Sequence, residues 1–457
     1  MMTLDPGLAG HLQTYLTGAR WFAGKGRRAP VVDRTCLPWL TPARQWPAVR
    51  FEVVEVSYDD TSGSAQAGGA YELYQLAVSY YAAPQPGVQH AEIARVTEDD
   101  LGPVVAYDAM QDPAAGRILL SCVLDGSTHG DDVAVVSFTL VPGVALTPDL
   151  RPMTYTGQQS NTSVIYGDVA MLKLFRRLEV GRNLDIEVHE ALGRLQVADV
   201  ARLYGWVDAQ WARGDQRLHA DLAMLVEQLP DAEDGWGLAL DALQLQTSFS
   251  EDSGLLGTAL AEIHESLRAA FPTATRSGAE LAARMKERLS RAAAVAPALE
   301  PYVTGLVGRF DALAETELAT QRVHGDFHLG QTLRTPGGWK IIDFEGEPVK
   351  TLAERAAPDS VWRDIAGLLR SLDYAAASVP GPTSREWALA ARNAFLGAYA
   401  GGELTEVDAA VLRAYEADKA IYEVIYEVRN RPDWVNIPLA AIAALSTASA
   451  SDDLVKE

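Results

Sequence analysis

Three polar residues at fixed spacing in the second half of the chain are of the types that activate a hydroxyl group and bind a metal ion. Asp326 stands in a His-Gly-Asp turn, Gln331 follows five residues later, and Asp343 comes twelve residues beyond it. A glycine beside an aspartate favours a tight, exposed loop, so the Asp326 carboxylate is available as a base. A carboxylate and an amide oxygen joined by a hairpin suit a hard cation such as Mg²⁺. We therefore predict that Asp326 is the catalytic base and that Gln331 and Asp343 are metal ligands.

Phosphoryl transfer from ATP needs these groups and a cation that holds the α- and β-phosphates. Lys173 is the candidate, because it lies in a strand-like run of alternating apolar residues. Glu187 falls fourteen residues later in a predicted helix, and kinases pair a strand lysine with a helix glutamate. Asp185 and Glu190 are alternatives to Glu187. The order of groups resembles the catalytic and metal loops of protein kinases, with His-Gly-Asp for His-Arg-Asp and Asp-Phe-Glu for Asp-Phe-Gly.

A short polar turn precedes the lysine strand and contains Ser160, Asn161 and Thr162. Its amides and hydroxyl groups could cap phosphate oxygens. A glycine-rich phosphate loop is absent from the sequence, so an ordinary polar hairpin is the alternative interpretation. Arg176 and Arg177 follow the strand and add the positive charge that an acidic protein needs near ATP.

The sequence also indicates a place for the adenine base. Residues 224–230 have the pattern of a strand that ends in a hinge. Backbone groups from Glu227 to Leu229 could form hydrogen bonds with adenine. Such contacts leave no side-chain pattern, so this prediction depends on position alone.

The elements that must position these residues change in kind along the chain. Residues 1–90 and 91–228 are rich in strand patterns, whereas residues 229–457 are mostly helical with a strand-like island at 339–343. Periodicity predicts helices at 185–195, 254–270, 278–297, 361–377, 385–400 and 407–429. We predict an α+β fold with two lobes, like that of eukaryotic protein kinases. Its domains would be an N-terminal cap (1–90), a β-rich N-lobe that binds the nucleotide phosphates (91–228) and a helical C-lobe (229–457).

Composition narrows the class of protein. The 457 residues carry a formal net charge of −22, which disfavours binding to nucleic acid and to anionic membranes. No apolar run reaches the roughly 20 residues of a membrane-spanning helix. The first residues lack the basic and apolar regions of a signal peptide, and two cysteines do not make a disulfide scaffold. We expect a cytoplasmic protein, either a monomer or a dimer.

Seven short segments occur in a characteristic order. They are residues 20–27, 159–163, 172–177, 324–331, 343–348, 363–367 and 431–434. Together they resemble the actinobacterial maltokinase family. The resemblance implies an aminoglycoside-phosphotransferase-like kinase fold with an added cap domain, ATP and Mg²⁺ as cofactors, and a sugar as the acceptor. The family includes maltose 1-kinases and related enzymes that act on glucosamine.

A sugar acceptor is bound by aromatic stacking and polar contacts. Tyr426 and Glu427 near the end of a long predicted helix, with Arg431 and Trp434 in the following turn, supply both kinds of contact. A solvated helix face with Glu–Arg ion pairs is the alternative. Glu345, just after the metal aspartate, is also predicted to reach the acceptor.

Several functions remain open at this point. Carboxylates around Asp326 suit a cationic amino sugar, so conversion of glucosamine to glucosamine 6-phosphate is the first hypothesis, with Asp326 contacting the acceptor hydroxyl. A maltose 1-kinase is the alternative. A nucleotide-binding pseudokinase is disfavoured because Lys173, Asp326, Gln331 and Asp343 are all present. A protein kinase is disfavoured because no Ala-Pro-Glu segment follows Asp343.

Overall fold

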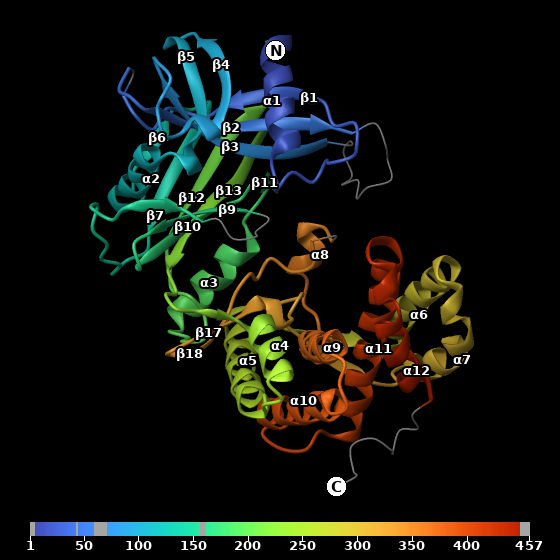
Figure 1. Ribbon diagram of the computed structural model, residues 1–457. Coiled ribbons are helices and arrows are strands. Elements are labelled where there is room, and N and C mark those ends of the chain that lie inside the picture. The colour runs from blue at the N-terminus through green and yellow to red at the C-terminus, as the bar shows by residue number, and fades with distance from the viewer. Residues whose placement is uncertain (1–4, 43, 59–70, 156–160, 349, 448–457) are drawn as a thin grey trace. The chain divides into compact units, whose positions relative to one another are not determined.

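The computed structural model describes the chain except for residues 1–4, 43, 59–70, 156–160, 349 and 448–457, which Figure 1 draws in grey. The chain forms two compact units. The first unit comprises residues 1–190, 201–230 and 349–352, and the second comprises residues 191–200, 231–348 and 353–457.

The first unit opens with an antiparallel sheet rich in valine, tyrosine and phenylalanine. Its strands pair in the order β1-β2-β3-β5-β4, and the short strand β11 pairs with β3. Side chains of β2 point alternately toward α1 and toward a second sheet, so nearly all of them are buried. The elements are α1 (Pro6–Gly18), β1 (Val31–Cys36), β2 (Ala48–Ser57), β3 (Tyr71–Tyr81), β4 (Glu92–Glu98), β5 (Gly102–Asp108) and β11 (Arg177–Leu178).

The second sheet of this unit is also antiparallel and pairs in the order β6-β7-β12-β13-β10-β9-β8. Gly167, with φ +56°, turns the chain between β9 and β10. The elements are α2 (Pro113–Asp125), β6 (Thr128–Gly130), β7 (Ala134–Leu140), β8 (Pro152–Thr154), β9 (Thr162–Tyr166), β10 (Ala170–Leu174), α3 (Leu184–Arg194), β12 (Leu203–Arg213) and β13 (Gln216–Glu227).

The two sheets share one hydrophobic core. Phe51 of β2 packs against Phe138 of β7, with ring centroids 6.3 Å apart, inside a single cluster of buried apolar side chains from both sheets. The Gln75 side chain of β3 donates a hydrogen bond to the Phe175 carbonyl oxygen at 2.6 Å. Because the first sheet continues through β4 and β5, the domain boundary predicted at residue 90 falls between two of its strands.

The second unit is mostly helical. The predicted helices are present within a few residues of their expected bounds. The strand-like island becomes β18, which pairs with β17, and β17 pairs in turn with β14. Helix α9 packs against α4 and α11 (Figure 1). The elements are β14 (Glu233–Asp234), α4 (Gly235–Gln244), α5 (Ser250–Ala270), β15 (Ala274–Ser277), α6 (Gly278–Val295), α7 (Val303–Asp311), β16 (Glu317–Thr320), β17 (Thr332–Thr335), β18 (Gly338–Ile341), α8 (Leu352–Ala356), α9 (Trp362–Ser378), α10 (Ser384–Ala400), α11 (Glu406–Asn430) and α12 (Asn436–Thr447).

Helix α11 shows why these segments fold as they do. The Thr405 hydroxyl caps its N-terminus by accepting from the Asp408 amide at 3.1 Å, and acidic residues in the first turn suit the helix dipole. Ile421 and Val424 are fully buried one turn apart. No helix among the described residues combines the length and the apolar character needed to cross a membrane.

Candidate active site

The loop that carries Asp326 is fixed by a buried carboxylate. Asp364 of α9 accepts hydrogen bonds from the backbone amides of His324, at 2.7 Å, and Gly325, at 2.8 Å. His264 of α5 holds the same carboxylate at 3.0 Å. Gly325 has φ +87°, a conformation that a residue with a side chain rarely adopts. The glycine of the His-Gly-Asp turn is therefore required by the backbone.

Burial by itself would raise the pKa of Asp364. Hydrogen bonds and charge from His264, with smaller contributions from His324 and the Gly325 amide, outweigh this effect and lower the pKa below its ordinary value. The carboxylate that anchors the loop is thus ionised at neutral pH. Asp364 lies in the Arg-Asp motif at 363–367, but no local pattern showed that it would anchor the loop.

Asp326 has a positively charged neighbour that the sequence did not reveal. The Lys419 ammonium of α11 lies 3.3 Å from Asp326 Oδ1. Burial would raise the pKa of Asp326, but Lys419, His328 and His324 lower it below its ordinary value. Asp326 is therefore an ionised carboxylate, as a group that takes the proton of a hydroxyl must be.

The structure brings the two predicted metal ligands together. Gln331 immediately precedes β17 and Asp343 follows β18, so the hairpin places them side by side; the Gln331 amide nitrogen donates to Asp343 Oδ2 at 3.2 Å. Asp343 has φ +68°, a left-handed conformation that is uncommon outside glycine. An amide oxygen and a carboxylate in this arrangement fit Mg²⁺, which prefers oxygen ligands.

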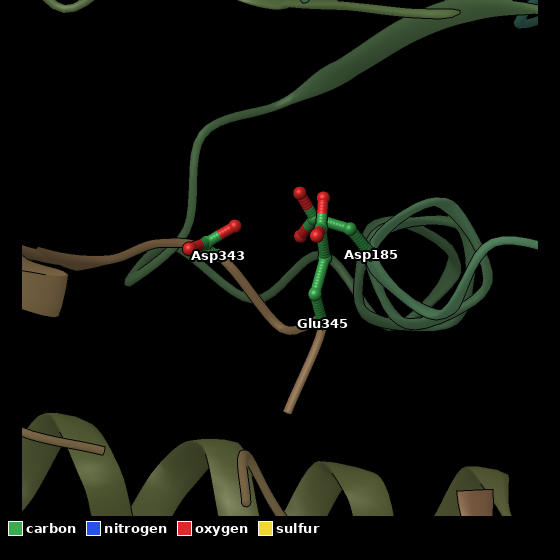
Figure 2. A group of neighbouring side chains, drawn as sticks. All are labelled: Asp185, Asp343 and Glu345. Carbon is green, nitrogen blue, oxygen red and sulfur yellow. The ribbon is translucent and has the colours of Figure 1, made fainter. Parts of the chain in front are cut away.

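Glu345 extends from the same loop as Asp343, two residues later, and Figure 2 shows both side chains leaving this segment. Its backbone carbonyl oxygen accepts a hydrogen bond from the Arg355 guanidinium at 2.6 Å. The loop that follows the second predicted metal ligand is thus held by an arginine at the end of α8.

In the first unit, Lys173 of β10 forms an ion pair with Asp185 of α3, with 3.0 Å between Nζ and Oδ2. The structure thus gives Lys173 a partner that the sequence treated as an alternative to Glu187, which lies two residues farther along α3. Asp185 sits in the first turn because the Asn183 side chain caps the helix, accepting from the Asp185 amide at 2.9 Å. Figure 2 shows the Asp185 carboxylate projecting from this helix.

Burial would raise the pKa of Asp185. The Lys173 ammonium and His189, one helical turn away, outweigh burial and hold this pKa well below its ordinary value. The Lys173–Asp185 pair is therefore ionised, and the lysine is held by a fixed carboxylate. This is the arrangement that the phosphate-binding prediction requires.

The polar turn before β9 can be assessed only in part. Ser160 lies outside the described residues. Asn161 is half-buried, and Thr162 begins β9 and accepts a hydrogen bond from the Arg176 guanidinium at 2.8 Å. The role of Ser160, Asn161 and Thr162 in binding phosphate stays a prediction.

The expectation for Arg176 and Arg177 is wrong for Arg176. Its side chain is only 1% exposed and pairs with Asp108 at 2.5 Å, in the core between the two sheets. Arg177 pairs with Glu72 at 2.9 Å. Both cations thus neutralise carboxylates of the first sheet, because each lies where that sheet meets the second one.

The predicted hinge follows β13 directly. The Glu227 amide donates to the Arg202 carbonyl oxygen at 2.8 Å, and the Gln228 amide donates to the Val169 carbonyl oxygen at 3.0 Å. These two amides are already used within the protein, so an adenine contact in this segment would use other backbone groups of residues 227–229, carbonyl oxygens included. The contribution of Glu227 and Leu229 to adenine binding remains a prediction.

The four aromatic and polar residues predicted for the acceptor form one cluster at the end of α11. Arg431 pairs with Glu427 at 2.7 Å, and its guanidinium lies 5.4 Å from the Tyr426 ring centroid and 4.9 Å from that of Trp434. Trp434 stacks on Tyr374 of α9 with centroids 6.4 Å apart. The Glu–Arg ion pair of the alternative interpretation is therefore present, within an aromatic setting.

A separate cleft lies beside Asp326 itself. It is lined by Arg288, Gly325, Asp326, Phe327, Glu347, Arg363, Gly367, Tyr415, Asp418, Lys419 and Tyr422. Glu427 is eight residues beyond Lys419 on α11, which is about 12 Å along the helix axis. Among the described residues, the lining thus includes Asp326 but none of Glu345 and the four residues of the cluster.

The charges in this cleft are largely paired. Arg363 holds Glu347 at 2.6 Å and Asp359 at 3.1 Å, and it also donates to the Gly325 carbonyl oxygen at 3.0 Å. Tyr415 donates its hydroxyl group to Asp359 at 2.8 Å. Arg363 of the 363–367 motif therefore binds the carbonyl oxygen of Gly325, whereas its neighbour Asp364 binds the amide of the same residue.

Comparisons with known proteins agree with this arrangement. Residues 15–112 match the maltokinase N-terminal cap domain, and residues 250–415 match the phosphotransferase enzyme family. The chain is 32% identical over 394 residues to a glucosamine kinase of Streptacidiphilus jiangxiensis, covering 74% of this chain and 88% of that protein. It is 31% identical over 328 residues to a glucosamine kinase of Mycolicibacterium smegmatis, covering 65% and 79%.

The fold agrees with that of a solved structure, a glucosamine kinase in complex with glucosamine, ADP and inorganic phosphate. The TM-score is 0.65 with 23% sequence identity, and the match covers 94% of this chain and 98% of that one. The cap match, the phosphotransferase match and the two relatives together show that the chain belongs to the phosphotransferase enzyme family, among the sugar kinases that carry a maltokinase N-terminal cap domain.

Proposed function

We propose that this protein is an ATP- and Mg²⁺-dependent kinase that converts glucosamine to glucosamine 6-phosphate, with Asp326 as the catalytic base. The observation that carries the proposal is the similarity to two glucosamine kinases over 88% and 79% of their lengths. The ionised Asp326 carboxylate and the Gln331–Asp343 pair support it, because each supplies a group that phosphoryl transfer needs.

In the proposed reaction, Asp326 accepts a hydrogen bond from the 6-hydroxyl group of the sugar and orients its oxygen. That oxygen forms a bond to the γ-phosphorus of ATP while the bond from phosphorus to the bridging oxygen breaks and ADP leaves. The hydroxyl proton passes to Asp326. Because the pKa of Asp326 is low, orientation of the hydroxyl precedes proton transfer, which completes late.

The remaining groups would hold the phosphates. Lys173, fixed by Asp185, would bind the α- and β-phosphates as a point charge. Gln331 and Asp343 would hold Mg²⁺, which neutralises the charge on the phosphate oxygens when it is bound. Use of ATP is consistent with a cytoplasmic protein.

The charge of the cleft does not select the acceptor. Its three carboxylates, Asp326, Glu347 and Asp418, are paired with three cations of the same lining. The preference for glucosamine over a neutral sugar therefore rests on the two glucosamine kinase relatives. A second candidate is maltose, because residues 15–112 match the cap domain of maltokinases.

The test is product formation from ATP and Mg²⁺ with glucosamine, maltose or glucose, measured as ADP release and as sugar phosphate by phosphorus NMR. We expect glucosamine to be the preferred acceptor, with phosphate on the 6-hydroxyl group. Phosphorylation of maltose at its anomeric hydroxyl group, without glucosamine turnover, would replace this proposal with the second candidate.

Asp326→Asn tests the assignment of the base. We expect kcat to fall by about 10²- to 10⁴-fold, because a general base contributes that much to proton transfer, while ATP binding persists. Asp311→Asn is the control, since Asp311 is an exposed carboxylate paired with Lys286 on the surface. An Asp326→Asn variant as active as the control would refute the role of Asp326.

A further inference from the structure

Lys419 is the cation nearest to Asp326 in the described part of the second unit. It lies in the middle of α11, with a side chain that is 29% exposed, and its ammonium is 3.3 Å from Asp326 Oδ1. The two residues are 93 positions apart in the chain, so the contact exists only because α11 packs against α9, whose Asp364 anchors the Asp326 loop. The proposed base is therefore held from two helices.

The other cations of the cleft are paired with different carboxylates. Arg363 is held by Glu347 and Asp359, and Arg288 pairs with Asp418 at 2.6 Å. Each is thus neutralised within the cleft lining. Tyr415 and Tyr422 complete the polar lining and carry no charge at neutral pH.

The two histidines of the Asp326 loop do not replace Lys419. His324 Nε2 lies 2.9 Å from the Ile342 carbonyl oxygen, so this nitrogen donates a hydrogen bond to that oxygen and not to the Asp326 carboxylate. His328 Nδ1 accepts a hydrogen bond from the Gly330 amide at 3.1 Å and is therefore unprotonated. Burial lowers the pKa of His328 below its ordinary value, although the Asp326 carboxylate opposes this effect.

We propose that Lys419 is a positioning residue for phosphoryl transfer: it holds Oδ1 of Asp326 and leaves Oδ2 for the acceptor hydroxyl group. This inference rests on the proposed role of Asp326 as base. An aspartate carboxylate without such a partner rotates about its terminal bond, and a misplaced base loses the aligned hydrogen bond that transfer requires. Because Lys419 lies in the middle of α11, the helix fixes the position of the ammonium group that holds Asp326.

The same ion pair keeps Asp326 ionised in a partly buried site. Removing the ammonium would leave burial as the dominant influence on Asp326, so its pKa would rise. A base works only in its ionised form. The acidic limb of the pH–kcat profile would therefore move to higher pH when Lys419 is replaced by an uncharged residue.

The test compares Lys419→Met and Lys419→Arg with the wild-type chain, using glucosamine, ATP and Mg²⁺. For Lys419→Met we expect kcat to fall by about 10²-fold, the scale of a misplaced catalytic group, with the acidic limb displaced to higher pH and KM for ATP unchanged. Lys419→Arg keeps the charge and should restore the wild-type position of the limb. A Lys419→Met enzyme with wild-type kcat and an unshifted profile would overturn the proposal.

Arg392→Met is the matched control for the loss of an ion pair. Arg392 holds Glu416 of the same helix at 2.6 Å and lines no part of the cleft beside Asp326. We expect this variant to be less stable but to keep the wild-type pH profile. If Arg392→Met shifts the acidic limb as much as Lys419→Met, the effect is structural and the positioning role is rejected.

Two further outcomes are separable. If Lys419→Met does not fold, Lys419→Gln removes the charge while keeping a polar end, and the same shift of the limb is expected; an unshifted limb would again reject the proposal. If wild-type protein does not phosphorylate glucosamine, the proposed function fails, and the profiles are measured with whichever sugar is turned over. The role of Lys419 is then accepted or rejected from the pH profiles measured with that sugar.

Discussion

Asp364 shows how one buried carboxylate can hold the loop that carries the proposed base, Asp326. It accepts from two consecutive backbone amides, of His324 and Gly325, and is itself held by His264. Removing it leaves the buried His324 amide and the partly buried Gly325 amide without this acceptor. The residue does not touch the reacting atoms, yet the position of Asp326 depends on it.

We predict that Asp364→Ala lowers the free energy of unfolding by roughly 1–3 kcal/mol for each unsatisfied amide and lowers kcat by about 10²-fold. Urea unfolding and steady-state kinetics provide the two measurements. Ser371→Ala, which removes a single hydrogen bond to the Leu329 amide from the same helix, is the control. Full activity in Asp364→Ala would show that the loop is held by other contacts.

Individual site residues differ in how far the sequence could predict them. Asp326, Gln331, Asp343 and Lys173 are recognisable because their spacing follows the loop, the hairpin and the strand that carry them. The Lys173–Asp185 pair depends on where Asn183 caps α3, a matter of one or two residues, so the sequence offered Asp185 only as an alternative to Glu187. Lys419 has no local signature, because its partner comes from a distant loop.

Among the elements, the first sheet carries an ion network that is unusual in its burial. Glu52 of β2 is 2% exposed and pairs with Arg34 of β1 at 2.6 Å and with Arg50 at 2.8 Å. Both arginines also reach Glu98 of β4, at 2.8 and 2.6 Å. Since β1 and β4 are the two ends of the strand order, this network joins opposite edges of the sheet.

The network makes a prediction about acid stability. Burial opposes ionisation of Glu52, but Arg50 and Arg34 prevail and lower its pKa from 4.5 to about 2. Its stabilisation is therefore complete above pH 4.5 and is lost as the pH falls from 4.5 toward 2. Glu52→Gln should flatten the fall in stability across this window, measured by urea unfolding at successive pH values.

Glu55→Gln is the control for this experiment, because Glu55 of the same strand pairs with Arg213 while remaining partly exposed. Its acid dependence should resemble that of the wild type. A Glu52→Gln curve parallel to the wild-type curve would show that another group governs acid unfolding.

The six helices that periodicity indicates and the strand at 338–341 could be predicted, because amphipathic periodicity and turn residues determine them locally. The extent of the first sheet could not. Its β4 and β5 follow a Pro-Gly segment at 84–87 that has the composition of a boundary, yet β5 returns to pair with β3 and β4 pairs with β5. Strand pairing over that distance is a tertiary choice that local sequence does not encode.

On the scale of the whole molecule, the chain divides into two units, and the cap match at 15–112 lies entirely within the first. The cap is integrated there by the shared core, by the β11–β3 pairing and by the buried Arg176–Asp108 pair, to which Tyr15 of α1 also donates. These contacts belong to one folded body.

We predict that a chain beginning at residue 113 does not fold normally. Its second sheet would lose the covering layer, leave Arg176 without a carboxylate and expose the apolar face that Phe138 shares with Phe51. Circular dichroism, thermal unfolding and ATP binding of the truncated and full chains provide the comparison. A truncated chain with a cooperative transition and normal ATP affinity would show that the cap is dispensable.

The shared core also sets the rules for building chimaeras between relatives in this family. Exchanging residues 1–112 alone would pack core side chains of one protein against the second sheet of another. Close-packed interiors tolerate such mismatches poorly. Exchanging residues 1–230 would carry both faces of the core together. A designer who wishes to recombine two such kinases should therefore place the first crossover after Pro230, where the sequence leaves the first unit.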